Sequence, residues 1–222
     1  MLGHDHRHPE KYAYRIQRRT NCAQGAELRA DLSVRGLAGQ ALGYKVNHPA
    51  NILKTKDLVM IKTLNDLFYE TLRDMFYAEK KILRTLPKLA KAVNSDELRA
   101  AFLHHRDETE GQVERIERVF ELIGKPARGK TCDAIDGILE EGNEVMQDFK
   151  GSLALDAGLL AGAQAVEHYE ISRYGTLIAW AKKMRLSEAP DLLQETLEQE
   201  IKTDETLTQI AKKAVNAAAI AK

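Results

Sequence analysis

The sequence predicts an all-α fold, in which residues 60–222 form a bundle of four long helices. From Met60 to the C-terminus, apolar residues recur every three or four positions, which is the spacing of amphipathic helices. Helix start and stop residues divide this region into four long stretches and one shorter stretch. The long stretches, of about 30 residues, exceed the usual helix length of about 11–12 residues, and packing in a bundle is the simplest way to bury them.

The first two long helices have clear boundaries. Thr63 is expected to cap the first helix, because Asp66 follows at the spacing of a capping box. Either Asn94 or Ser95 is expected to cap the second helix, and Gly124 marks its end. The residues expected to face the core are Leu64, Phe68, Leu72, Met75, Ile82, Leu86, Leu89 and Val93 in the first helix, and Leu98, Phe102, Val113, Ile116, Phe120 and Ile123 in the second.

A shorter helix, from about Cys132 to Phe149, separates the second long helix from the third. This connection is too long for a hairpin loop and suits a crossover along the bundle, which is the connection that ferritin-like folds use. The third long helix is expected to bury residues from Leu153 onward. Ser187 is expected to cap the fourth, which has Ala214 among its inward residues. The predicted fold is therefore a ferritin-like four-helix bundle with a helical crossover between helices two and three.

Residues 1–59 have a different character. They show no sustained helical or strand period, and their basic residues outnumber their acidic ones. We expect this segment to be a disordered extension of the bundle at 60–222. Two interpretations remain open: Met60 is the true start of the protein and the upstream segment is a mis-assigned extension, or the segment is a genuine flexible tail.

A chain that begins at Met60 should melt at nearly the same temperature as the full chain, because the apolar stripes all lie downstream of this residue. Thermal unfolding followed by circular dichroism would compare the two chains. A large loss of stability in the shorter chain would contradict the prediction.

The composition excludes several classes of protein. No run of about 18 apolar residues is present, so we expect no membrane association, and the N-terminus lacks the apolar stretch of a secretion signal. Cys22 and Cys132 lie far apart and form neither a disulfide framework nor a metal-site spacing. These features predict a cytoplasmic protein with free thiols. No nucleotide-binding loop, nucleophile triad or nucleic-acid motif is visible, so a nucleic-acid partner is not expected.

Polar side chains interrupt the apolar stripes on all four long helices. Glu79, for example, lies four residues after Met75 and three before Ile82, so it points in the same direction as these apolar residues. The same spacing places further polar side chains inward, namely His105, Glu108 and Gln112 on the second helix, Glu167 and Glu170 on the third, and Glu200 and Asp204 on the fourth. Glu141, on the crossover helix, fits a ligand and a solvated edge position equally well.

The acids also agree in height. Glu79, Glu108, Glu167 and Glu200 each lie near the middle of their helices, so the four helices deliver carboxylates to one central layer. Burying an ionised carboxylate costs several kcal/mol unless it is paired, and the nearby inward positions carry too few Lys or Arg to neutralise all of them. Carboxylates in bundle cores bind paired iron or manganese ions well. The sequence therefore predicts a site for two divalent metal ions.

A simpler explanation exists for each residue taken alone. A single inward glutamate is commonly exposed at the edge of its helix, but the same coincidence on four helices at one height favours a metal site. His168 lies off the inward stripe and is interpreted as a surface residue or a neighbour of the ligands. Tyr174, seven residues after Glu167, is interpreted as core packing.

Short motifs around these acids resemble a known family. They are Asp74–Lys80, Glu108–Gln112, Leu139–Gly142, Glu167–Glu170, and Trp180-Ala181 together with Thr196–Glu200 and Asp204. These motifs resemble the YciE/YciF family of ferritin-like bacterial stress proteins, over about residues 61–218. The resemblance implies a fold similar to rubrerythrins, a homodimer of helical bundles and production under stress, without an established reaction.

The chain departs from the wider di-iron pattern, which has one Glu on each of two helices and Glu-x-x-His on the other two. Glu79 matches a single Glu, and the Glu167–Glu170 pair resembles the paired acids of the third rubrerythrin helix. Both Glu-x-x-His motifs are absent, so Gln112 and Asp204, or His105, would have to substitute. This departure argues against a typical peroxidase or oxygenase activity.

Two functions remain. The first is a stress-associated protein that binds iron or manganese through the inward acids and protects against oxygen or peroxide. The second is a non-enzymatic helical dimer that acts as an interaction or structural protein without bound metal. The sequence does not decide whether a reaction is catalysed.

Overall fold

The computed structural model describes residues 62–220, and the secondary structure within this range is entirely helical. The helices are α1 (Leu64–Ala92), α2 (Asp96–Leu122), α3 (Asp133–Asp148), α4 (Leu155–Lys183), α5 (Ala189–Ile210), the π-helical η1 (Ala211–Val215) and α6 (Asn216–Ala219). The prediction of a disordered extension at residues 1–59 lies outside the described range. So does Cys22, one of the two thiols.

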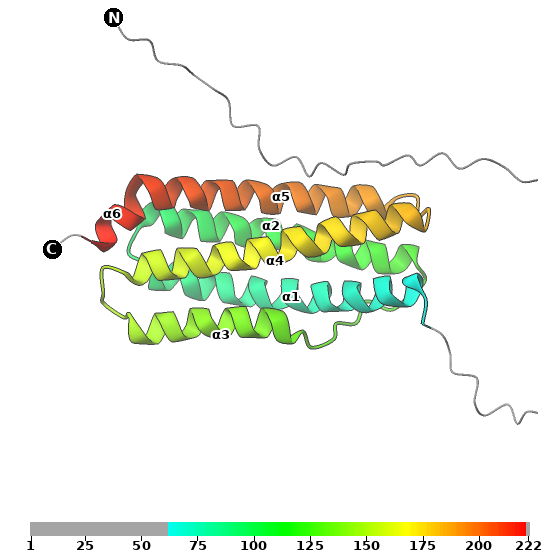
Figure 1. Ribbon diagram of the computed structural model, residues 1–222, viewed down its shortest axis with the longest axis horizontal. Coiled ribbons are helices and arrows are strands. Elements are labelled where there is room, and N and C mark those ends of the chain that lie inside the picture. Colours follow the sequence, from blue (N-terminus) through cyan, green and yellow to red (C-terminus); the bar gives the residue numbers. More distant parts are fainter. Residues whose placement is uncertain (1–61, 221–222) are drawn as a thin grey trace, which may run out of the picture. The chain divides into compact units, whose positions relative to one another are not determined.

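The four long helices close a ring. In Figure 1, α1, α2, α4 and α5 lie side by side along a common direction. The helix α1 packs against α2 and α4, while α5 packs against the same two helices. The crossover helix α3 lies outside this ring, against α4 and α1. The predicted all-α four-helix bundle with a helical crossover is therefore confirmed.

Local capping explains where α1 and α2 begin. The Thr63 side chain accepts a hydrogen bond from the backbone N–H of Asp66, and the Asp66 carboxylate accepts one from the N–H of Thr63, which completes the predicted capping box. Ser95, rather than Asn94, caps α2, because its hydroxyl oxygen accepts a hydrogen bond from the N–H of Leu98 at 3.3 Å.

Four predicted positions were wrong. Leu64 is exposed in the first turn of α1 rather than facing the core, and the first buried residue of that helix is Phe68. The N-cap of α5 is Glu188, not Ser187, because the Glu188 carbonyl accepts the first helical hydrogen bond, from the N–H of Leu192 at 3.2 Å; Pro190 lies in the first turn, where its missing N–H is harmless. Leu153 is exposed, since it lies in the turn before α4. Ala214 is exposed and Val215 is buried instead, because the π-helical segment adds a residue to the turn and rotates the following positions.

A buried carboxylate aligns α4 with the turn between α1 and α2. Asp156, in the first turn of α4, accepts hydrogen bonds from the backbone N–H groups of Asn94 at 2.9 Å and Ser95 at 2.7 Å. Such bonds to an ionised acceptor are among the stronger ones in proteins. This contact helps to fix the relative heights of α1, α2 and α4, and therefore the level at which their middle residues meet.

The interior of the bundle holds two separate apolar clusters, one toward each end. Leu86, Phe102, Leu159 and Leu207 belong to one cluster, and Leu72, Phe120, Leu177 and Leu193 belong to the other. The layer between them is polar and buried. Within residues 62–220, no helix is long and apolar enough to cross a membrane.

Candidate metal centre

The polar layer in the middle of the bundle is formed by six buried side chains, which we call the central cluster. They are Glu79 from α1, His105 and Gln112 from α2, Glu167 and Glu170 from α4, and Glu200 from α5. Each long helix therefore contributes at least one residue, at the level that the sequence predicted. The two apolar clusters above and below shield this layer from water.

Four members of the central cluster lie close enough to share one cation. His105, Glu167, Glu170 and Glu200 each offer a ligand atom, and these atoms all lie within 4.8 Å of one another. All four side chains are buried. The set combines one imidazole nitrogen with carboxylate oxygens, which is a donor set that suits iron and manganese.

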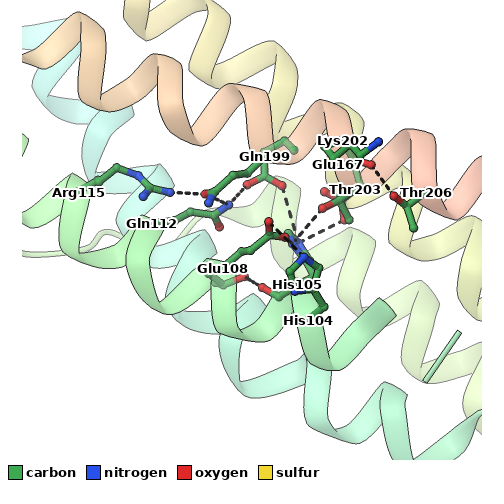
Figure 2. A network of polar contacts seen from close by, with 12 residues as sticks. His104, His105, Glu108, Gln112, Arg115, Glu167, Gln199, Lys202, Thr203 and Thr206 are labelled. Carbon is green, nitrogen blue, oxygen red and sulfur yellow. Dashed lines mark hydrogen bonds and ion pairs between the residues drawn. The ribbon is translucent and has the colours of Figure 1, made fainter. Parts of the chain in front are cut away.

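His105 connects the interior of the cluster with its edge. Its Nε2 atom lies 3.4 Å from Glu167 Oε1 and 3.7 Å from Glu200 Oε2. The opposite nitrogen, Nδ1, lies 3.5 Å from the Thr203 hydroxyl and 3.8 Å from Glu108 Oε2. Figure 2 shows His105 in the middle of this network, between residues of α2 and the neighbouring helices. A histidine that binds a metal through one nitrogen commonly contacts a carboxylate with the other.

Hydrogen bonds hold two other members in place while leaving each with an unpaired oxygen. The hydroxyl of Tyr174, itself fully buried, donates to Glu79 Oε1. The side-chain amide of Gln112 donates to Glu200 Oε1. The sequence had suggested that Tyr174 only packs in the core. The structure shows that Tyr174 also orients Glu79.

All buried side-chain nitrogen and oxygen atoms that lack a hydrogen-bond partner within residues 62–220 belong to the central cluster. They are Glu79 Oε2, His105 Nε2, Gln112 Oε1, Glu167 Oε2, both carboxylate oxygens of Glu170, and Glu200 Oε2. Leaving one such atom unpaired costs about 1–3 kcal/mol, and more where the group is charged. Their concentration at one point indicates a site whose partner is a cation.

The carboxylates of the cluster hold protons more tightly than ordinary glutamates. Burial, reinforced by the nearby Glu200, raises the pKa of Glu79 to about 8. Burial also raises the pKa values of Glu167 and Glu170 well above their usual range, with Glu200 and Glu79 respectively as the strongest neighbouring charges. Burial also raises the pKa of Glu200. Without a metal ion, the cluster therefore retains protons near neutral pH.

No basic side chain in the described part of the chain neutralises the cluster. Arg115 on α2 has only a small lowering effect on the pKa of Glu79, and its guanidinium donates to Thr196 at 2.9 Å, to Glu195 at 2.7 Å and to Gln199. These contacts direct its charge to polar groups on α5 that lie outside the cluster. The sequence-based expectation of too few inward cations agrees with this arrangement.

The structure brings five of the predicted site residues together, namely Glu79, Gln112, Glu167, Glu170 and Glu200. It adds His105, which the sequence had placed inward and had offered as a substitute ligand, but not among the main ligands. The sequence contained a signal for His105, because it lies three residues after Phe102, which was expected to face inward. The structure buries both residues.

Three predicted residues lie outside the central cluster. Glu108 is partly exposed beside Nδ1 of His105, which lowers its pKa. Asp204, also partly exposed, accepts a hydrogen bond from Gln164 at 2.9 Å and lies 3.5 Å from the exposed His168. Glu141 is exposed on α3, because that helix lies outside the four-helix ring.

Comparison with known proteins places the chain in a family. The family described as "Domain of unknown function (DUF892)" matches residues 63–220. Protein YciF of Escherichia coli strain K12 is 43% identical over 157 residues, which cover 70% of this chain and 95% of YciF.

Solved structures agree with this placement. The crystal structure of the E. coli stress protein YciF matches with a TM-score of 0.67, over 70% of this chain and 99% of that chain. YcfI of Rhodopseudomonas palustris, described as a structural protein, is 38% identical with a TM-score of 0.64, over 71% of this chain and 98% of its own. A protein from Xanthomonas campestris, 22% identical with a TM-score of 0.56, shares the fold. The chain therefore belongs to the family of the stress protein YciF.

Proposed function

We propose that this chain is a stress-associated protein that binds two divalent metal ions, iron or manganese, in its central cluster. The observation that carries this proposal is the gathering of unpaired buried atoms at a single point of the bundle. A divalent cation satisfies unpaired carboxylate oxygens and an imidazole nitrogen together, and it also balances the charge of the carboxylates.

The charge of the cluster favours two ions over one. Glu79, Glu167, Glu170 and Glu200 carry four negative charges when all are ionised, and His105 and Gln112 are neutral ligands. Two divalent ions balance these charges, whereas a single divalent ion would leave two negative charges buried. Both oxygens of Glu170 are unpaired, which supports a ligand that can contact both ions.

Each neighbouring residue has a role in such a site. Tyr174 holds Glu79 by donating to one of its oxygens, and Gln112 holds Glu200 in the same way. Glu108 faces Nδ1 of His105 and favours the tautomer that leaves Nε2 free as a ligand. When bound, a pair of ferrous ions supplies two electrons, which with two protons reduce dioxygen to hydrogen peroxide, or hydrogen peroxide to two waters.

Protein purified without a chelating tag should contain about two iron or manganese ions per chain, by analogy with other bundle centres. Replacing Glu167 with alanine should remove most of this metal, because it deletes a buried ligand. Replacing Glu114 or Glu117, which are exposed on α2, should leave the content unchanged. Mass spectrometry of the metals would measure all four proteins. A wild-type protein that takes up neither metal, even when both are supplied, would contradict the proposal.

The alternative function is a helical dimer without metal, and the description of YcfI as a structural protein favours it. Exposed apolar side chains such as Leu67 and Ile201 are compatible with a second copy of the chain as partner. We expect a homodimer under either function. Sedimentation velocity at micromolar concentration should show a dimer, and a monomer alone would exclude it.

A further inference from the structure

Two small cavities lie in the crevice that α3 forms with α1 and α4. The outer cavity is bordered by Gly142 and Met146 of α3 and by Gly162 of α4. The inner cavity is bordered by Leu86 and, at its deep end, by His105 and Glu167. The two cavities share the side chains of Thr85, Leu89, Leu139, Ala163 and Val166. They are therefore neighbouring parts of one crevice that ends at the central cluster.

The crevice is narrow and apolar. Each cavity has a volume of about 20 Å³, and roughly 10–15 Å³ is enough for one water-sized molecule. The hydroxyl of Thr85 is already paired, because it donates to the backbone carbonyl of Lys81 at 2.9 Å. The remaining polar side chains of the lining are His105 and Glu167, each with an unpaired atom and each buried by more than nine tenths.

We propose that this crevice is the route by which dioxygen reaches the metal centre, an inference that rests on the proposed function. An apolar passage of this size excludes hydrated ions, because they would lose their water without compensation. Dioxygen is small and uncharged, so it has no strongly bound water to lose when it enters the passage. Two ferrous ions held by the central cluster would supply the two electrons that dioxygen needs. With two water molecules as the source of protons, the products would be hydrogen peroxide, two hydroxide ions and two ferric ions.

Two glycines keep the outer part of the crevice open. A Cβ atom built on Gly142 or Gly162 meets nothing within 4 Å. Both residues lie inside helices, where glycine is less favourable than alanine, so helix stability does not explain their presence. The backbone at Gly162 therefore accepts a Cβ atom without moving, and Gly162 borders the crevice, so a larger side chain is introduced there to block it.

The first test uses metal-free protein and dioxygen itself as the probe. Raised dioxygen pressure enhances the NMR relaxation of methyl groups that the gas can reach. Val166, in the crevice, and Ile178, in the other apolar cluster, lie on the same helix and are 6% and 5% exposed. We expect dioxygen to enhance the relaxation of the Val166 methyls several-fold more than that of the Ile178 methyls. Equal relaxation of the two residues would overturn the route.

The second test plugs the crevice. Gly162→Leu should slow the oxidation of the ferrous protein by dioxygen several-fold in stopped-flow measurements, without changing the amount of ferrous iron bound. Gly175→Leu is the matched control, because Gly175 lies on the same helix and also has free space at its Cβ position. It should oxidise like wild type. Gly162→Ala should give a smaller effect in the same direction.

The outcomes separate the route from the proposed function. Unchanged oxidation in a folded Gly162→Leu protein that binds iron normally would overturn the route alone. A wild-type protein that binds neither iron nor manganese would overturn the proposed function, and the relaxation test, made without metal, would still decide whether dioxygen enters the crevice.

Discussion

Glu170→Gln should raise the melting temperature of the metal-free protein and remove the further rise that metal ions cause in the wild type. Both carboxylate oxygens of Glu170 are buried and unpaired, and burial beside Glu79 raises its pKa well above the usual range. Glutamine keeps the shape, needs no proton to be neutral on burial, and gives the neighbouring carboxylates an N–H donor. Relief of an unpaired buried group is worth about 1–3 kcal/mol, or roughly 2–10 °C for a domain of this size.

Metal should stabilise the wild type and have little effect on the variant. It binds the folded wild type and stabilises it by mass action, whereas the variant has lost a ligand. Calorimetry with and without manganese would give both shifts, with Glu117→Gln as the control because Glu117 is exposed on α2. If Glu170→Gln gains as much stability from metal as wild type does, Glu170 is not a ligand.

The periodicity of the sequence was sufficient to predict the bundle because each helix carries its boundaries locally. The box formed by Thr63 and Asp66 depends on residues three apart and needs no tertiary information. The error at Ala214 has a different origin. A single π-helical turn changes which side chains face inward, and the regular spacing of apolar residues does not reveal it.

The central cluster was predicted where direction and height both followed from helical geometry, as they did for Glu79, Glu167 and Glu200. The period alone could not decide between His105 and Glu108, which lie three residues apart on nearly the same side of α2. The rotation of α2, set by the packing of buried residues such as Phe102, turns His105 inward and leaves Glu108 at the edge. Spacing within one helix does not determine this rotation.

The metal-free protein should become less stable as the pH rises from about 5 to about 8. Burial raises the pKa of Glu79 from its ordinary value of 4.5 to about 8, and raises those of Glu167, Glu170 and Glu200. In this range the folded protein holds protons that the unfolded chain has released. Since the folded state binds more protons, its stability is greatest below the ordinary pKa and is lost as the pH rises through the raised values.

The stability of the metal-free protein should fall steeply with rising pH, and bound metal should abolish this dependence. Each such group contributes up to about 1.4 kcal/mol per pH unit, although protons shared within the cluster make the total smaller than the sum. Metal ions replace these protons, so their affinity should rise with pH. Urea unfolding at several pH values, with and without manganese, would therefore show stabilities that diverge as the pH increases. A metal-free protein whose stability is constant or rises over this range would mean that the carboxylates are ionised and paired in some other way.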